Sequence, residues 1–165
     1  MRKLVVLDVD NCLIYANTSN EDYDFKIRYY RVKKRDHLDS FLNHILQKYD
    51  VAIWSANFYQ YVHDIVDKLN LKQKVKFIHT EDDCLIKHEQ GRVKYVKYLS
   101  IIEDYGYDMK DIIMVDDNID GFPKFKDNVI FIPPFKGEKD GDLLRVKDII
   151  DKAATLEDVR GSLNF

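Results

Sequence analysis

Short apolar runs alternate with longer amphipathic stretches along this chain. Five runs have the length and the nearly continuous apolar character of single buried strands. They are Leu4–Leu7, Val51–Trp54, Val75–Ile78, Ile112–Val115 and Val129–Ile132. Strands that are apolar on both faces are typical of a parallel sheet that is covered on both sides. The pattern therefore predicts an α/β fold with helices on both faces of a mainly parallel sheet.

Four stretches between these runs carry apolar residues at intervals of three and four, the spacing of an amphipathic helix. They are Asp36–Tyr49, Phe58–Leu69, Val93–Tyr105 and Leu143–Ala154. One segment differs, because Asp24–Val32 alternates with a period of two, which is typical of paired strands. We expect Tyr15–Lys34 to form a short β flap after the first strand, with Phe25, Ile27 and Tyr29 on its apolar side.

Composition narrows the class of protein. The chain has 165 residues, 45% of them apolar and 33% charged, so we expect one globular domain over residues 1–165. Its net charge of −3 gives no general attraction for nucleic acid or membranes, and no apolar run could span a bilayer. The two cysteines match no disulfide framework, and the first strand follows Met1 too closely for a secretory signal. We therefore expect an intracellular protein, cytoplasmic or nuclear and not secreted.

Polar residues follow three of the predicted strands. Asp8 and Asp10 come after the first strand, Ser55 after the second, and Asp116 and Asp117 after the fourth. In open α/β sheets, ligands bind beyond the carboxyl ends of the strands. Carboxylates crowded there repel one another unless a cation lies among them, and oxygen ligands beside a phosphate are the usual setting of Mg²⁺. The sequence therefore predicts a Mg²⁺ site at this edge of the sheet.

These polar residues also have an ordinary structural explanation, because Asp and Ser often cap helices or form turns. Two acidic pairs at separate strand ends, with a serine at a third, are harder to explain as caps alone. A lysine would balance the charge of a bound phosphate. Lys94 or Lys97, in the third predicted helix, could supply it.

Four segments resemble, in order, the motifs of the haloacid dehalogenase (HAD) superfamily. They are Leu4–Leu13 for the DxDx[T/V]L opening, Trp54–Ala56 for the Ser/Thr motif, Tyr95–Ser100 for the lysine motif and Val115–Asn118 for the acidic motif. Within the superfamily the likeness is greatest to the FCP/SCP group, the phosphatases that act on the RNA polymerase II C-terminal domain. Lys34–Leu42, the YVKxLS stretch Tyr95–Ser100 and Leu156–Arg160 carry this finer resemblance.

The resemblance implies a Rossmann-like HAD fold and Mg²⁺-dependent hydrolysis of a phosphomonoester. Asp8 would attack phosphorus and form an aspartyl-phosphate, and Asp10 would protonate the leaving oxygen and then activate water. Ser55 and Lys97 would bind the phosphate oxygens. The ligands of Mg²⁺ would be Asp8, the backbone carbonyl of Asp10 and Asp117, with Asp116 supporting them from behind.

Two residues depart from the family pattern. Cys12 stands where the family usually has Thr, which would weaken a hydrogen bond that positions the catalytic loop and so reduce activity. Asp36 stands where the FCP/SCP group usually has Pro. This second change lies at a predicted helix start, where Asp is a good N-cap.

The chain has no insertion large enough for a cap domain, so we expect an open site suited to a phosphoryl group on a larger molecule. The resemblance implies phosphoserine or phosphothreonine in a protein segment. The flap is also basic, and this is either a solvated face or a lip for a phosphopeptide or a nucleic-acid end. Its basic residues are Lys26, Arg28, Arg31, Lys33, Lys34 and Arg35. A nucleotide or polynucleotide-end phosphatase is therefore the alternative enzyme, with nucleic acid not favoured.

An alternative from another class is a phosphoacceptor or binding module without turnover. Receiver domains also collect an acidic pair, a phosphoaccepting Asp, a Ser or Thr and a Lys at strand ends. In receivers the acidic pair comes first and the lysine follows the last strand, whereas here Lys97 precedes Asp116. Asp10 in addition supplies the acid and base that turnover needs. The sequence therefore favours an enzyme.

Overall fold

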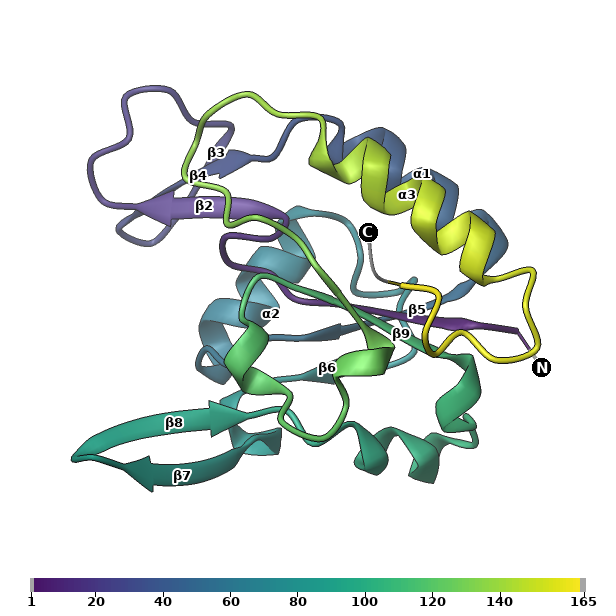
Figure 1. The fold of residues 1–165 in the computed structure, drawn as a ribbon. Helices are drawn as coiled ribbons and strands as arrows, with labels where there is room; N and C mark the ends of the chain where they lie inside the picture. The colour runs from purple at the N-terminus through teal and green to yellow at the C-terminus, as the bar shows by residue number, and fades with distance from the viewer. Residues whose placement is uncertain (1, 164–165) are drawn as a thin grey trace.

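The computed structural model describes residues 2–163, and a five-stranded parallel sheet forms its centre (Figure 1). β1 (Leu4–Leu7) lies in the middle and pairs with β5 (Asp50–Trp54) and β9 (Ile112–Asp116), so the carboxyl ends of these three strands lie side by side. The order across the sheet is β10 (Val129–Phe131), β9, β1, β5 and β6 (Ile78–His79). The predicted parallel sheet is confirmed. The strand predicted over Val75–Ile78 is shorter than expected, because Lys74 and Val75 both bond back to the carbonyl of Leu71 in a turn.

The two faces of the sheet are covered by different kinds of helix. Val5 and Leu7 of β1 share one apolar cluster with three α-helices, and Leu4 and Val6 face a second cluster. The α-helices are α1 (Leu38–Lys48), α2 (Tyr59–Lys68) and α3 (Asp142–Ala153). The 3₁₀-helix η2 (Leu99–Tyr105) and the loops around Phe122 cover the second face. The alternation of side chains along β1 thus divides the core into two layers.

The helix predicted over Val93–Tyr105 is wrong in its first part. β7 (Leu85–Glu89) and β8 (Arg92–Val96) form an antiparallel hairpin there, and the chain turns helical only at η2. Gln90 and Gly91 have φ values of 49° and 75° in the turn, the left-handed conformation that tight hairpins need. Lys97 therefore follows a strand, and Lys94 lies within one.

The predicted flap is confirmed as a three-stranded antiparallel sheet in the order β2-β4-β3. Its strands are β2 (Ile14–Asn17), β3 (Phe25–Ile27) and β4 (Tyr30–Lys34). Ile27 is buried as expected, but Tyr29 is 85% exposed. The prediction for Tyr29 is wrong because β3 ends at Ile27. Arg28, with a φ of 51°, turns the chain there, so the alternation of sides along the strand does not continue to Tyr29.

The flap and the β7–β8 hairpin project from the same end of the molecule, the end toward which β1 runs (Figure 1). They are the two β-sheets outside the central one in residues 2–163. Within that range no helix combines the length and the apolar character needed to cross a bilayer. The flap and the hairpin therefore flank the edge at which the sequence predicts the site.

Arg35, just after β4, joins three distant segments. Its guanidinium is 1% exposed and donates to the carbonyl of Cys12 at 3.1 Å and to that of Pro133 at 2.8 Å. It also pairs with Asp140 at 3.1 Å and Asp142 at 3.0 Å. The flap, the loop after β1 and the start of α3 are thus held by one buried cation.

Asp36 does not cap α1 as the sequence suggested. The N-cap of this helix is His37, which has a φ of 69° and no side-chain cap bond. The backbone N–H of Leu38 bonds instead to the carbonyl of Arg35. A tight turn fixed by the Arg35 network thus starts the helix.

We expect Arg35→Ala to lower the free energy of unfolding by about 2–4 kcal/mol, because the half-buried Asp140 loses its ion pair, Asp142 is left with Arg145, and two backbone carbonyls lose a donor. Urea unfolding followed by the fluorescence of Trp54, the only tryptophan in the chain, measures this. Lys34→Ala is the control, because Lys34 pairs with the exposed Asp39 and its loss costs less than about 1 kcal/mol. Equal losses in the two variants would contradict the structural role of Arg35.

Candidate active site

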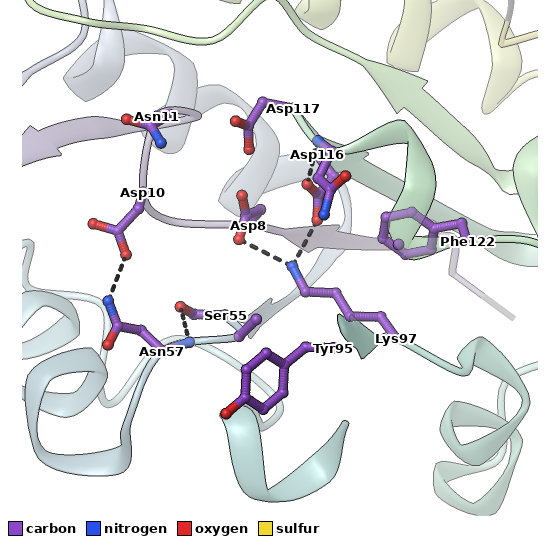
Figure 2. A pocket seen from close by; sticks show the side chains of 13 residues that line it. Asp8, Asp10, Asn11, Ser55, Asn57, Tyr95, Lys97, Asp116, Asp117 and Phe122 are labelled. Carbon is purple, nitrogen blue, oxygen red and sulfur yellow. Dashed lines mark hydrogen bonds and ion pairs between the residues drawn. The ribbon is translucent and has the colours of Figure 1, made fainter. Parts of the chain in front are cut away.

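A buried lysine lies between two carboxylates at the carboxyl edge of the sheet (Figure 2). The Nζ atom of Lys97 is 3.0 Å from Oδ1 of Asp8 and 2.6 Å from Oδ2 of Asp116. Asp8 follows β1 and Asp116 ends β9, so neighbouring strands deliver the two carboxylates. Ions removed from water are costly unless they are paired. The three side chains therefore form one interdependent unit.

Burial sets the protonation of this unit. Burial raises the pKa of Asp8 to about 7, against the opposing effect of Lys97, and the neighbouring Asp117 raises it further. Burial, followed by the charge of Asp8, likewise raises the pKa of Asp116 to about 6. Burial would lower the pKa of Lys97, but Asp116 and Asp8 together raise it. Lys97 is therefore charged at neutral pH, while Asp8 lies near its midpoint of ionisation.

The acidic side chains fit a hard cation. Carboxylate oxygens of Asp8, Asp116 and Asp117 all lie within 4.8 Å of one another. Burial raises the pKa of Asp117, as it raises those of Asp8 and Asp116. Oxygen donors in such a group are the ligands that Mg²⁺ prefers. Asp116 is already engaged by Lys97 and by the backbone N–H of Asn118 at 2.8 Å, which suits a supporting position.

Asp10 is held by neighbours from a different side. The hydroxyl of Tyr61 donates to Oδ1 at 2.5 Å, and the amide of Asn57 donates to Oδ2 at 3.3 Å. Burial raises the pKa of Asp10, and the bonds from Tyr61 and Asn57 partly offset the rise. Figure 2 shows the carboxylate directed at Asn57. Asp10 thus occupies a separate environment from Asp8, two residues earlier.

All six residues that the sequence singled out line one cavity of about 290 Å³. Ser55 is buried at the end of β5, and its Oγ accepts from the backbone N–H of Asn57 at 3.1 Å. Lys94, the alternative lysine, is not part of this lining. The cavity is lined by Asp8, Asp10, Asn11, Ser55, Ala56, Asn57, Tyr95, Lys97, Asp116, Asp117, Asn118, Gly121 and Phe122. Four carboxyl groups, a hydroxyl and an ammonium therefore line one space.

A family model described as NLI interacting factor-like phosphatase matches residues 3–160. The chain belongs to this family. It is 27% identical to CTD small phosphatase-like protein 2 of Dictyostelium discoideum, over 94% of this chain and 28% of that protein. It is also 27% identical to CTD nuclear envelope phosphatase 1B of Danio rerio, over 99% of this chain and 71% of that protein. A third relative is the mitochondrial import inner membrane translocase subunit TIM50 of Debaryomyces hansenii, 29% identical over 97% of this chain and 32% of that one.

The chain spans 28% and 53% of the length of two Dictyostelium relatives that it matches. Among solved structures, the fission yeast RNA polymerase II CTD phosphatase Fcp1 has the same fold, with a TM-score of 0.62. The match has 15% sequence identity and covers 95% of this chain and 52% of that one. An uncharacterised protein from Listeria monocytogenes has a TM-score of 0.65 at 15% identity, over 93% of this chain and 99% of that chain. The predicted HAD-type fold is thus confirmed.

One departure from the NLI interacting factor-like pattern has a clear structural setting. Cys12 is fully buried in the loop after β1, and its Sγ lies 3.8 Å from the carbonyl oxygen of Val115. Burial, then the charge of Asp8, raises the pKa of this thiol well above its ordinary value. Cys12 is therefore a protonated, weak donor toward β9. Its expected effect on activity stays a prediction.

Sequence reasoning missed Tyr61 as a partner of Asp10. Tyr61 belongs to the apolar stripe of α2. Packing of its ring is enough to explain a tyrosine at this position, so the pattern gave no sign that its hydroxyl has a partner. A buried tyrosine usually finds a hydrogen-bond partner, which is the signal that could have indicated one. Tyr95 and Phe122 were also missed as lining residues, and the Phe122 ring centre lies 5.9 Å from Nζ of Lys97.

We expect Asp8→Asn to stabilise the protein in EDTA at pH 8. The ordinary pKa of this carboxyl is 3.8 and its folded pKa is about 7, so ionised Asp8 opposes folding more strongly as pH rises between these values. The variant should gain about 1–3 kcal/mol at pH 8 and little at pH 5. Urea unfolding at both pH values measures the gain. Exposed Asp67→Asn is the control, and a gain of equal size at both pH values would contradict ionisation of Asp8 as its cause.

Proposed function

We propose that this protein is a Mg²⁺-dependent phosphomonoesterase that forms an aspartyl-phosphate on Asp8 and acts on phosphoserine or phosphothreonine in a protein. The observation that carries this proposal is the meeting of Asp8, Lys97 and the Asp116–Asp117 pair in one cavity with Asp10. The family and the relatives named as phosphatases support it. In this proposal residues 1–165 act as a single phosphatase domain without a cap.

The proposed binding mode follows from charge. The ammonium of Lys97 and the hydroxyl of Ser55 would hold the phosphate oxygens, where negative charge accumulates as the reaction proceeds. Asp8, the backbone carbonyl of Asp10 and Asp117 would hold Mg²⁺, with Asp116 supporting them. A bound Mg²⁺ supplies the positive charge that lets an anionic carboxylate approach an anionic phosphate.

The proposed chemistry has two displacements at phosphorus. In the first, an oxygen of Asp8 bonds to phosphorus while the bond to the ester oxygen breaks, and Asp10 gives its proton to that oxygen. In the second, the Asp10 carboxylate takes a proton from water, and the water oxygen displaces Asp8 and releases phosphate. Burial raises the pKa of Asp10, which favours the proton it needs for the first step.

Ion pairs in the flap support a protein substrate over a nucleic-acid end. Lys33 lies 2.6 Å from Asp22, Lys34 lies 2.8 Å from Asp39, and Arg28 lies 3.6 Å from Asp64. These contacts neutralise much of the basic lip that a polynucleotide would use. A nucleotide or polynucleotide-end phosphatase remains the second candidate, and the same assay tests it.

The compartment is also part of the proposal. We expect an intracellular location, cytoplasmic or nuclear, and no membrane partner. The relatives' names include nuclear envelope phosphatases and a mitochondrial import subunit, so family membership is compatible with more than one compartment.

Phosphate release from a matched panel tests the function. The panel contains p-nitrophenyl phosphate, phosphoserine, phosphothreonine and phosphotyrosine peptides, a nucleoside monophosphate and a 3′-phosphorylated oligonucleotide. We expect turnover that stops in EDTA, returns with Mg²⁺ and falls at least about 1,000-fold in Asp8→Asn, because the neutral amide of Asn is a far weaker nucleophile than a carboxylate. A preference for the oligonucleotide would select the second candidate. No turnover of any substrate by folded, Mg²⁺-binding protein would select a phosphoacceptor or binding module.

Tyr61→Phe tests the assignment of Asp10 as the acid. The bond from Tyr61 favours the carboxylate form, so its removal should raise the pKa of Asp10 further. Because the first displacement needs protonated Asp10, the alkaline limb of the pH profile of kcat/KM should move to higher pH. A loss of rate that is equal at every pH would indicate a structural effect on α2 alone.

A further inference from the structure

The β7–β8 hairpin has two chemically different faces. Directly opposed residues of an antiparallel pair lie on the same face, and successive residues alternate between faces. Ile86 pairs with Tyr95 and His88 pairs with Val93, so these side chains share one face. The other face carries Leu85 opposite Val96, Lys87 opposite Lys94 and Glu89 opposite Arg92.

The face that carries Ile86 is apolar and open. Ile86 is 56% exposed and Val93 is 55% exposed, although both are residues that a folded chain usually buries. Tyr95, next to Ile86 on this face, lines the cavity of the candidate active site. The apolar surface therefore begins at the site and continues outward along the hairpin, which is the arrangement expected of a binding surface.

The charge of the hairpin favours an anionic partner. Residues 85–96 carry Lys87, Arg92 and Lys94 against a single acidic residue, Glu89, whereas the whole chain has a net charge of −3. The site at the base of the hairpin would take an anionic phosphoryl group. The three basic residues lie on the face opposite Ile86 and Val93, so their positive charge would attract a phosphorylated segment to the hairpin as a whole, while the apolar side chains select the face that it contacts.

We propose that the Ile86–Val93 face of the hairpin binds the protein substrate beside its phosphorylated residue, with an apolar substrate side chain against Ile86 and Val93. The inference rests on the proposed function and adds a sequence preference to it. In the described residues β7 pairs with β8 alone, so one edge of the hairpin offers backbone groups to an extended peptide. Single-stranded nucleic acid would instead need a row of aromatic rings for its bases, and the hairpin carries no Phe or Trp and one Tyr, Tyr95, with the imidazole of His88 as its other ring.

A peptide series combined with hairpin variants tests the proposal. Each nine-residue peptide has a central phosphoserine, alanine elsewhere and one leucine that is moved through the flanking positions. We expect leucine at one or two positions to raise kcat/KM about five-fold, the effect of partly burying one aliphatic side chain. In the double variant Ile86→Ser, Val93→Ser the gain should vanish, while turnover of p-nitrophenyl phosphate is retained.

Leu85→Ser is the matched control. Leu85 is an aliphatic residue of the same strand with 51% exposure, but it lies on the opposite face. It should keep both the leucine gain and the turnover of p-nitrophenyl phosphate. A gain that survives the double variant, or that Leu85→Ser also removes, would overturn the assignment of this face, as would a series with no gain at any position.

Binding separates this inference from the proposed function. The same peptides, now carrying a fluorescent label, are mixed with the Asp8→Asn protein. Their fluorescence anisotropy measures binding without turnover. Leucine-dependent binding that needs Ile86 and Val93, without turnover by the wild type, would support the surface and reject the phosphatase. Two results would overturn the proposal. In the first, the double variant weakens binding of a 3′-phosphorylated oligonucleotide and not of peptides. In the second, it converts a dimer to monomers in sedimentation while peptide binding is unchanged.

Discussion

The buried lysine between Asp8 and Asp116 is the interaction on which the site depends. Two carboxylates at the ends of neighbouring parallel strands would repel each other in a medium that solvates neither. Lys97 pairs with both of them and so balances one negative charge in the group of three neighbouring carboxyl groups that Asp117 completes. The negative charge that remains when these groups are ionised would suit a divalent cation. Burial raises the pKa of Asp8 and of Asp116, so the ionised forms of these carboxyl groups oppose folding.

The parallel register makes the crowding unavoidable. Leu7 aligns with Ile53 of β5 and with Val115 of β9, so the next residues, Asp8, Trp54 and Asp116, arrive at one level. The chain then leaves each strand in a different direction. The loop after β1 is held by Arg35 and directs Asp10 toward the start of α2. There Tyr61 of the helix and Asn57 just before it donate hydrogen bonds to the carboxylate of Asp10. Two carboxyl groups two residues apart therefore acquire different environments, which is what separate roles require.

The sequence predicted what depends on local pattern and on strand ends. Continuous apolar runs located four of the five central strands closely, and five of the six candidate residues that line the cavity were found from strand ends. The sixth, Lys97, was one of two lysines expected in a helix, and it follows a strand instead. Sequence patterns gave the wrong element where a helical spacing of apolar residues runs across a β-hairpin. Val96, Leu99 and Ile102 fit a helical stripe, yet the chain between Leu85 and Val96 pairs with itself. Contacts between distant segments, such as those of Tyr61 and Arg35, leave no periodic trace, so only the folded structure reveals them.

Lys97 comes from the end of the hairpin and not from the central sheet. Its backbone N–H bonds to the carbonyl of Gly121, and the two residues before it belong to β8. A two-stranded hairpin with few packed side chains opens more readily than the sheet. The cation that neutralises the buried Asp8 and Asp116 is therefore positioned by the β7–β8 hairpin, which is largely exposed. Opening of the hairpin and ionisation of Asp8 are thermodynamically linked. A contact that holds the hairpin closed changes the pKa of Asp8, and ionisation of Asp8 changes how readily the hairpin opens.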